Sequence, residues 1–224
     1  MTNRNLRALA CGAARLTVAA AFLAAATPAL AQARTSPIGI RGFADAGSTR
    51  FAATRSFEAV LGTASGPVFG GGGEVLLPRG IFVSLRGARF RDTGQRVFVS
   101  GGQTYPLGIP TLVTVRPLEL TAGYRLNRPG WRVIPYAGGG TGWHKYTESS
   151  DFADPSENVS LTATGYHVLG GAEFPILGWL AGAVEAQWSR VPDGLGADAN
   201  GVSAAFGESD MGGTTLRVKV VLGR

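Results

Sequence analysis

Alternating apolar and polar residues dominate the last stretch of the chain. Between residues 211 and 224, apolar side chains occupy every second position, and Arg217 and Lys219 lie between them. A period of two is the signal of a β-strand whose two faces meet different surroundings. The sequence offers no amphipathic helix to cover the apolar face. We therefore expect lipid to cover it and this strand to close a barrel, because a sheet within a membrane cannot leave an edge open.

The same alternation recurs along the chain and predicts eight strands. They span residues 36–47, 66–78, 81–91, 112–126, 131–146, 161–174, 179–191 and 211–224. The predicted connections alternate between short ones at 78–80, 127–130 and 175–178 and long ones at 48–65, 93–111, 147–160 and 192–210. Within the second long connection, the turn-forming residues at 92–94 predict a break in the third strand, and 98–110 is expected to be a loop or a strand extension. Tight periplasmic turns and long external loops are typical of outer-membrane barrels. The predicted fold is therefore an all-β, eight-stranded, antiparallel up-and-down transmembrane β-barrel, with both termini on the periplasmic side.

The first long connection contains a short predicted helix. Ser56 is a suitable N-terminal cap, helix-forming residues follow it, and Gly62 is a suitable end. The sequence leaves open whether this helix plugs the mouth of the barrel. Glycine runs at 70–73 and 138–140 fall within predicted strands, where they favour tight curvature or close backbone approach. A phosphate-binding loop is a weaker interpretation, because neither the Lys-Ser/Thr pair nor a helix start follows the first run.

The N-terminal segment has the pattern of a secretory signal peptide. Arg4, Arg7 and Arg15 precede or open an apolar run at 16–26, and Ala29-Leu30-Ala31 gives a cleavage pattern. The apolar run is too short to span a bilayer. We expect residues 1–31 to be removed, which leaves a barrel domain at 32–224. Cys11, the only cysteine, would leave with it. The mature chain would then have no disulfide and no cysteine metal ligand.

Removal of the signal peptide changes the charge balance. The net charge falls from +6 to +3, with 18 basic residues against 15 acidic ones. So mild an excess does not predict nucleic-acid binding. We expect no cofactor and no metal, because two histidines without defined acidic partners do not make a convincing metal site.

Strand parity divides the charged and apolar residues between two surfaces. With the apolar faces toward lipid, the interior charges are predicted to be Arg41, Asp45, Glu74, Arg86, Glu119, Arg125, Glu173, Glu185, Arg217 and Lys219. The lipid-facing residues are predicted to include Leu118, Leu120, Val168, Leu216, Val218 and Val220. An eight-stranded barrel is barely wide enough to be filled by its own side chains, so charges in it must pair. We expect a salt-bridged lumen that blocks solutes.

Aromatic residues gather near the predicted strand ends, as expected of two interfacial belts. The predicted girdle comprises Tyr124, Trp131, Trp143, Tyr166, Phe174 and Trp188. Phe82, Phe90 and Tyr146 lie at the same levels and are assigned to the belts as well. An ordinary aromatic core of a soluble sandwich is the alternative interpretation.

Four segments together resemble a known family. They are the predicted signal peptide, the strands containing Val133–Gly140 and Leu169–Phe174, and the final strand with its alternating basic and apolar residues. The whole mature chain resembles the small outer-membrane β-barrel domains of the OmpA/OmpX type. Such barrels usually end in an aromatic residue that the assembly machinery recognises, whereas this chain ends in Leu222-Gly223-Arg224.

The resemblance implies a monomer in the outer membrane of a Gram-negative-type bacterium, in contact with lipid, lipopolysaccharide and the assembly machinery. We expect no enzymatic activity and a structural or surface-interaction role through the long loops. Three alternatives stay open: an OmpW-like narrow channel for small hydrophobic compounds, a lipid A acyl-modifying barrel enzyme, and a soluble lipocalin-like barrel. An acyl-modifying enzyme would need a Ser/His/acid arrangement at the lipid boundary, for which His144 and His167 are the available histidines.

Overall fold

The chain folds into one closed barrel. The computed structural model describes residues 38–100, 103–152, 158–196 and 202–223. The predicted signal peptide at 1–31 and parts of three predicted loops, at 101–102, 153–157 and 197–201, lie outside these ranges. The strands are β1 (Gly39–Phe51), β2 (Ser65–Leu76), β3 (Ile81–Ser100), β4 (Gln103–Arg125), β5 (Ile134–Ser149), β6 (Val159–Leu177), β7 (Leu180–Arg190) and β8 (Gly213–Gly223).

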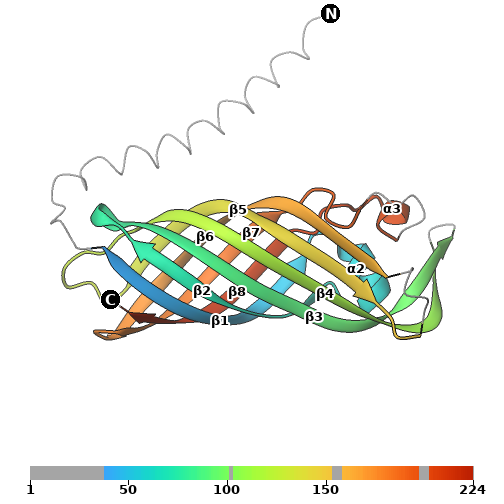
Figure 1. Cartoon of the computed structure of the whole chain (residues 1–224), viewed down its shortest axis with the longest axis horizontal. Coiled ribbons are helices and arrows are strands. Elements are labelled where there is room, and N and C mark those ends of the chain that lie inside the picture. Colours follow the sequence, from blue (N-terminus) through green and yellow to red (C-terminus); the bar gives the residue numbers. More distant parts are fainter. Residues whose placement is uncertain (1–37, 101–102, 153–157, 197–201, 224) are drawn as a thin grey trace, which may run out of the picture.

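Each strand pairs with the next in antiparallel fashion, and β8 returns to pair with β1 (Figure 1). The prediction of an eight-stranded up-and-down barrel is confirmed. Across the closing seam, Gly42 lies opposite Leu222 and Phe51 lies opposite Gly213. Closure satisfies the backbone hydrogen bonds of both terminal strands, which a sheet in lipid requires.

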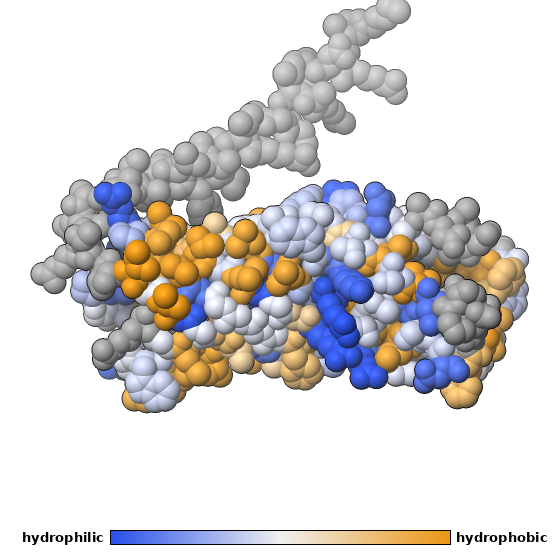
Figure 2. Space-filling view, viewed as in Figure 1, coloured by the Kyte–Doolittle hydropathy of each residue, from blue (hydrophilic) through white to orange (hydrophobic). Residues whose placement is uncertain are grey.

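The final strand shows the predicted division between its two faces. Leu216 and Val218 are 62% and 59% exposed, whereas Arg217 between them is 5% exposed. The apolar side chains therefore point away from the barrel axis and the charged ones point toward it. Figure 2 shows the consequence on one side of the molecule, where apolar side chains cover much of the outer surface.

The two ends of the barrel differ. At one end, here the turn end, lie both termini of the barrel and the short connections at Pro78–Gly80, 126–133 and 178–179. The first of these is a single 3-10 turn, η2. At the other end, here the loop end, lie two short helices and the β3–β4 hairpin (Figure 1).

The strand break predicted at 92–94 is wrong, and the strand extension is the correct one of the two interpretations of 98–110. β3 and β4 continue past the predicted break as a hairpin in which Phe98 lies opposite Tyr105, with one register shift between Gln95 and Val97. Pairing with β2 stops at Phe90, and pairing with β5 stops at Leu112, so the hairpin extends beyond the rest of the barrel. The turn-forming residues at 92–94 suggested a break, but cross-strand pairing overrides this local preference.

The loop end carries α2 (Thr54–Leu61) and α3 (Val202–Phe206). The predicted helix in the first long connection is confirmed, and it ends at Gly62, whose φ of 76° suits glycine. The prediction that Ser56 caps it is wrong, because the N-cap is Ala53 and Ser56 lies buried within the first turn. The helix α3 was not predicted.

No helix in the described ranges is both long enough and apolar enough to cross a bilayer.

The first glycine run lies in β2 and permits close packing of strands. A Cβ atom added at Gly72 would lie 1.9 Å from the carbonyl oxygen of Leu85 on β3. No side chain fits at such a distance. This agrees with the interpretation of the run as a place of close backbone approach.

Candidate functional site

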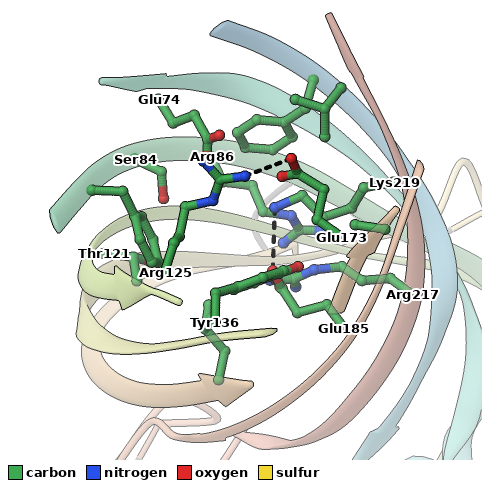
Figure 3. A pocket seen from close by; sticks show the side chains of 15 residues that line it. Glu74, Ser84, Arg86, Thr121, Arg125, Tyr136, Glu173, Glu185, Arg217 and Lys219 are labelled. Atoms are coloured by element: carbon green, nitrogen blue, oxygen red, sulfur yellow. Dashed lines mark hydrogen bonds and ion pairs between the residues drawn. The ribbon is translucent and has the colours of Figure 1, made fainter. Parts of the chain in front are cut away.

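The interior between the turn end and the barrel centre is filled with charged side chains. All ten predicted interior charges lie there, and each belongs to an ion pair. They form two groups, and Figure 3 shows members of both, among them Arg125 with Glu173 and Lys219 with Glu185, around one cavity in the interior. Side chains so far apart in sequence meet because every second residue of each strand points inward.

The turn-end network consists of Arg41, Glu74, Arg125 and Glu173. The Arg41 guanidinium donates two parallel hydrogen bonds to the Glu173 carboxylate, both 2.9 Å long. It also donates through Nε to Glu74 at 2.7 Å. Arg125 donates to the same Glu173 carboxylate at 2.5 Å. One carboxylate thus links two arginines from different strands, and the bidentate geometry fixes its orientation.

The central network begins on β1 and crosses the lumen. Arg86 donates to both oxygens of Asp45, at 2.6 and 2.9 Å, and to Glu119 at 3.0 Å. The side-chain amide of Gln187 then donates to Glu119 at 2.6 Å and accepts from Arg217 at 2.8 Å. Gln187 therefore bridges a carboxylate and a guanidinium that do not touch each other.

Glu185 completes the central network. It accepts hydrogen bonds from Arg217, from the Tyr136 hydroxyl at 2.9 Å and from the Lys219 ammonium at 3.2 Å. The Lys219 ammonium also lies 4.1 Å from the centre of the Phe43 ring, a favourable cation–π distance. Arg86, Arg217 and Lys219 balance Asp45, Glu119 and Glu185 in formal charge.

Formal charge cancels within each network separately, which limits the cost of removing these groups from water. A cavity among the side chains of both networks has a volume of about 20 Å³. That is little more than one water molecule needs, so the networks fill this part of the lumen.

The loop end of the interior is filled by apolar side chains instead. This mouth core is built by residues of α2, of the strand ends and of the β7–β8 connection. Its buried members are Phe51, Ala53, Phe57, Ala64, Phe90, Val113, Val115, Tyr146, Val191 and Met211. The ring of Phe57 on α2 stacks on Phe51 with 3.9 Å between ring centres. The ring of Phe90 meets Phe51 edge-on at 4.9 Å.

The helix α2 therefore lies across the mouth as a plug. Gly94 of β3 makes this possible, because a Cβ atom there would lie 2.0 Å from the carbonyl oxygen of Val60. The residue that suggested a strand break in the sequence is instead the point where the helix approaches the barrel wall.

The β7–β8 connection holds the first turn of α2. The Glu208 carboxylate accepts hydrogen bonds from the backbone N–H groups of Arg55 and Ser56, at 3.2 and 2.8 Å, and from the Ser56 hydroxyl at 2.9 Å. The Arg55 guanidinium lies over the ring of Phe206 at the end of α3, 4.5 Å from its centre. A carboxylate at a helix N-terminus satisfies free N–H groups and favours the helix dipole.

Both histidines face the lumen. His167 and His144 are 2% and 6% exposed. The Nε2 atom of His167 lies 2.8 Å from the Thr121 hydroxyl, and that of His144 lies 3.9 Å from Glu119. Neither is at the lipid boundary, where an acyl-modifying site would be expected. In the described ranges, no three His, Cys, Asp or Glu side chains are arranged to hold a metal ion.

The predicted exterior residues lie on the outer surface. The six predicted lipid-facing side chains and the six girdle aromatics are all exposed, between 38% and 62%. In the loop-end belt, Tyr166 and Trp188 pack at 6.0 Å between ring centres. Phe82, Phe90 and Tyr146 were wrongly assigned to the belts. Their parity turns them inward, and all three are buried.

Two interior residues were not assigned to the charge network, and parity alone could have found one of them. Gln187 follows Glu185 by two positions, so it shares the inward face. Tyr136 lies beside the glycine run of β5, which hides the alternation there. Both are polar residues whose value to the network depends on partners from distant strands.

Comparison with known proteins identifies the class. The sequence profile of the outer membrane protein β-barrel domain family matches residues 17–221. The chain belongs to this family, in agreement with the predicted OmpA/OmpX-type resemblance and with a location in the outer membrane. No curated protein sequence gives a significant match.

Solved structures of outer-membrane proteins are similar in fold. A major outer membrane protein from Thermus thermophilus aligns with a TM-score of 0.52 at 12% identity, over 84% of this chain and 100% of that one. Neisserial surface protein A aligns with a TM-score of 0.51 at 11% identity, over 84% and 97%. The N-terminal barrel domain of Pseudomonas aeruginosa OprF aligns with a TM-score of 0.46 at 12% identity, over 86% and 100%. At these identities the likeness concerns the fold.

Proposed function

We propose that this protein is a closed, non-enzymatic outer-membrane barrel with a structural or surface-interaction role. The observation that carries the proposal is the filling of the lumen. Two charge-neutral networks occupy its centre and turn end, and a helix with its own apolar core occupies its mouth. A solute would have to displace both. The parts that remain available for contacts are the β3–β4 hairpin and the connections at the loop end.

Conductance in planar lipid bilayers tests the closed lumen. We expect the protein to give no single-channel events, whereas an OmpW-like channel would give them. Replacing residues 54–61 with a Gly/Ser linker should leave the barrel silent, because the central network still blocks it. Steady channels in the unaltered protein would overturn the proposal.

Mass spectrometry of lipid A tests the absence of enzymatic activity. Cells that contain the protein and cells that lack it should give the same acylation pattern. The burial of His144 and His167 in the lumen supports this expectation. Gain or loss of one acyl chain only in the presence of the protein would favour the acyl-modifying alternative.

We further propose that the chain is exported with a cleaved signal peptide, inserted by the outer-membrane assembly machinery and active as a monomer. Closure between β1 and β8 supports the last point, since it leaves no sheet edge for a second copy to extend. N-terminal sequencing of the membrane-inserted protein should begin at Gln32, and sedimentation in detergent should give one chain per particle.

A further inference from the structure

Four cationic side chains gather on the outer surface of the barrel near its loop end. Arg89 and Arg91 lie on β3, Arg116 lies on β4 and Lys145 lies on β5. All four are exposed. They point outward, because the residues beside them in sequence, such as Phe90, Val115 and Tyr146, are buried in the mouth core.

The strand register brings these cations together. Arg116 lies directly opposite Lys145. On β3 and β4, Gly87 pairs with Leu118 and Phe90 pairs with Val115. The same register between these two pairs places Arg89 opposite Arg116. Arg91 follows two positions after Arg89 on the same face. Three neighbouring strands thus present a continuous line of positive charge, here called the cationic row, to the surroundings of the barrel.

Like charges directly opposite each other on adjacent strands destabilise a sheet. In the interior, every arginine of the two networks has a carboxylate partner. Among the residues that the structure describes, no carboxylate lies within ion-pair distance of any member of the cationic row. A sheet that keeps this repulsion on its surface is suited to an anionic ligand that would relieve it.

The surroundings of the cationic row indicate which anion fits. Toward the turn end it borders the apolar outer surface, where Leu118 and Trp143 lie opposite each other and are 44% and 49% exposed. Phe69 lies opposite Arg89 and is 63% exposed. In Figure 2 a hydrophilic strip crosses the outer face over β3 and β4 and interrupts the apolar surface. Such a boundary matches a molecule with anionic groups at one end and acyl chains at the other.

We propose that Arg89, Arg91, Arg116 and Lys145 bind the phosphate groups of a phosphorylated glycolipid of the outer leaflet, with its acyl chains against Leu118 and Trp143. Arginine forks and a lysine ammonium are the side chains best suited to phosphate oxygens. This site rests on the proposed function, because the barrel must lie in the membrane for the site to meet lipid. The site adds to that function the chemical class of lipid that the outer surface binds.

Binding of defined lipids to the full mature protein in nonionic detergent tests the site. The probes are lipid A with two phosphates, the same lipid with its phosphates removed, and inorganic phosphate. We expect the bisphosphorylated lipid to bind tightly, the dephosphorylated lipid to bind weakly, and affinity to fall with added salt. At about fivefold for each cation, R89Q/R116Q/K145Q should lose on the order of a hundredfold in affinity.

Arg50→Gln is the matched control. Arg50 is also an exposed cation near the loop end, but it lies between Ser65 and Thr214 and has no cation opposite it. This variant should keep the affinity of the unaltered protein. If the triple variant does not fold, as judged by a heat-modifiability gel, R116Q alone should lose about fivefold, and R116K, which keeps the positive charge, should lose less than R116Q.

Three results would overturn the proposal. They are equal binding by the triple variant and the unaltered protein, equal loss in R50Q, and equal affinity for lipid A with and without phosphates. Inorganic phosphate that competes at concentrations similar to the lipid would show an anion site and overturn the lipid assignment. Conductance is measured in a separate experiment. A barrel that conducts but still binds the lipid would refute the closed lumen of the proposed function and would leave the lipid site standing.

Discussion

Between the turn end and the barrel centre, the lumen is filled by arginine, lysine and carboxylate side chains, whereas its mouth is filled by phenylalanine, valine and methionine. The same eight strands build both regions. In the charged region, long side chains from opposite walls reach each other directly, as Arg41 on β1 and Glu173 on β6 do. At the mouth, α2 enters the barrel and contributes its own apolar residues, chiefly Phe57.

This difference separates two kinds of stability. Charged pairs removed from water add little net stability, but breaking one leaves an uncompensated charge. Apolar contacts add stability in proportion to buried area. The strands cannot release the networks without unfolding, whereas α2 lies in a connection and can leave the mouth locally. Damage to the networks should therefore unfold the whole barrel, and damage to the mouth core should first free the helix.

The largest effect is expected from Glu185→Gln. The neutral amide leaves Arg217 and Lys219 buried without their carboxylate. The expected loss is roughly 3–5 kcal/mol of unfolding free energy. Urea unfolding in lipid vesicles, followed by tryptophan fluorescence, measures it. Glu58→Gln removes an exposed carboxylate from α2 and should change little. Equal stability of the two variants would show that the central network is not required.

Phe57→Ala should act on the mouth alone. The ring is 4% exposed, and its loss leaves a cavity between Phe51 and the barrel wall. We expect a cost of roughly 3–5 kcal/mol, expressed as release of α2. Trypsin cleavage after Arg55 reports this release, and heat modifiability on a gel reports whether the barrel stays folded. Phe57→Leu should show a smaller effect. Unfolding of the whole barrel, without earlier cleavage at Arg55, would contradict the local character of the mouth core.

Val218→Arg sharpens the contrast between the interior and the exterior. Val218 follows Arg217 in β8 but points outward, so a guanidinium there meets lipid. An arginine on the lipid face of a barrel costs roughly 2–4 kcal/mol at mid-bilayer. Urea unfolding in vesicles measures the loss, with Val218→Leu as the apolar control. A neutral result would place Val218 outside the hydrocarbon region.

Glu208→Ala is expected to have the smallest effect. It removes the carboxylate that caps the first turn of α2 from the β7–β8 connection. Loss of a helix cap costs about 1 kcal/mol. Faster trypsin cleavage at Arg55, with unchanged unfolding of the barrel, is the expected outcome. Asp151→Ala, in another connection, serves as the control. No change in cleavage would mean that the mouth core alone holds the helix.

The division of residues between the two surfaces follows from the sequence. The period of two along each strand separates Arg217 from Val218 whatever the partners are, because a strand alternates its faces by covalent geometry. The number of strands and the helix ending at Gly62 were predictable for the same kind of local reason. Where glycines interrupt the alternation, as beside Tyr136, this local signal weakens.

The partners of each charge were decided by the tertiary structure. Glu173 meets Arg41 and Arg125 because of the strand register and the closure of the barrel, and Ser56 receives its carboxylate from Glu208 at the far end of the chain. The strand status of 93–100 and 103–111 and the approach of α2 at Gly94 depend likewise on pairing between strands. Side-chain direction is a property of the local backbone, but contacts depend on how all eight strands close, and no short stretch of sequence contains that information.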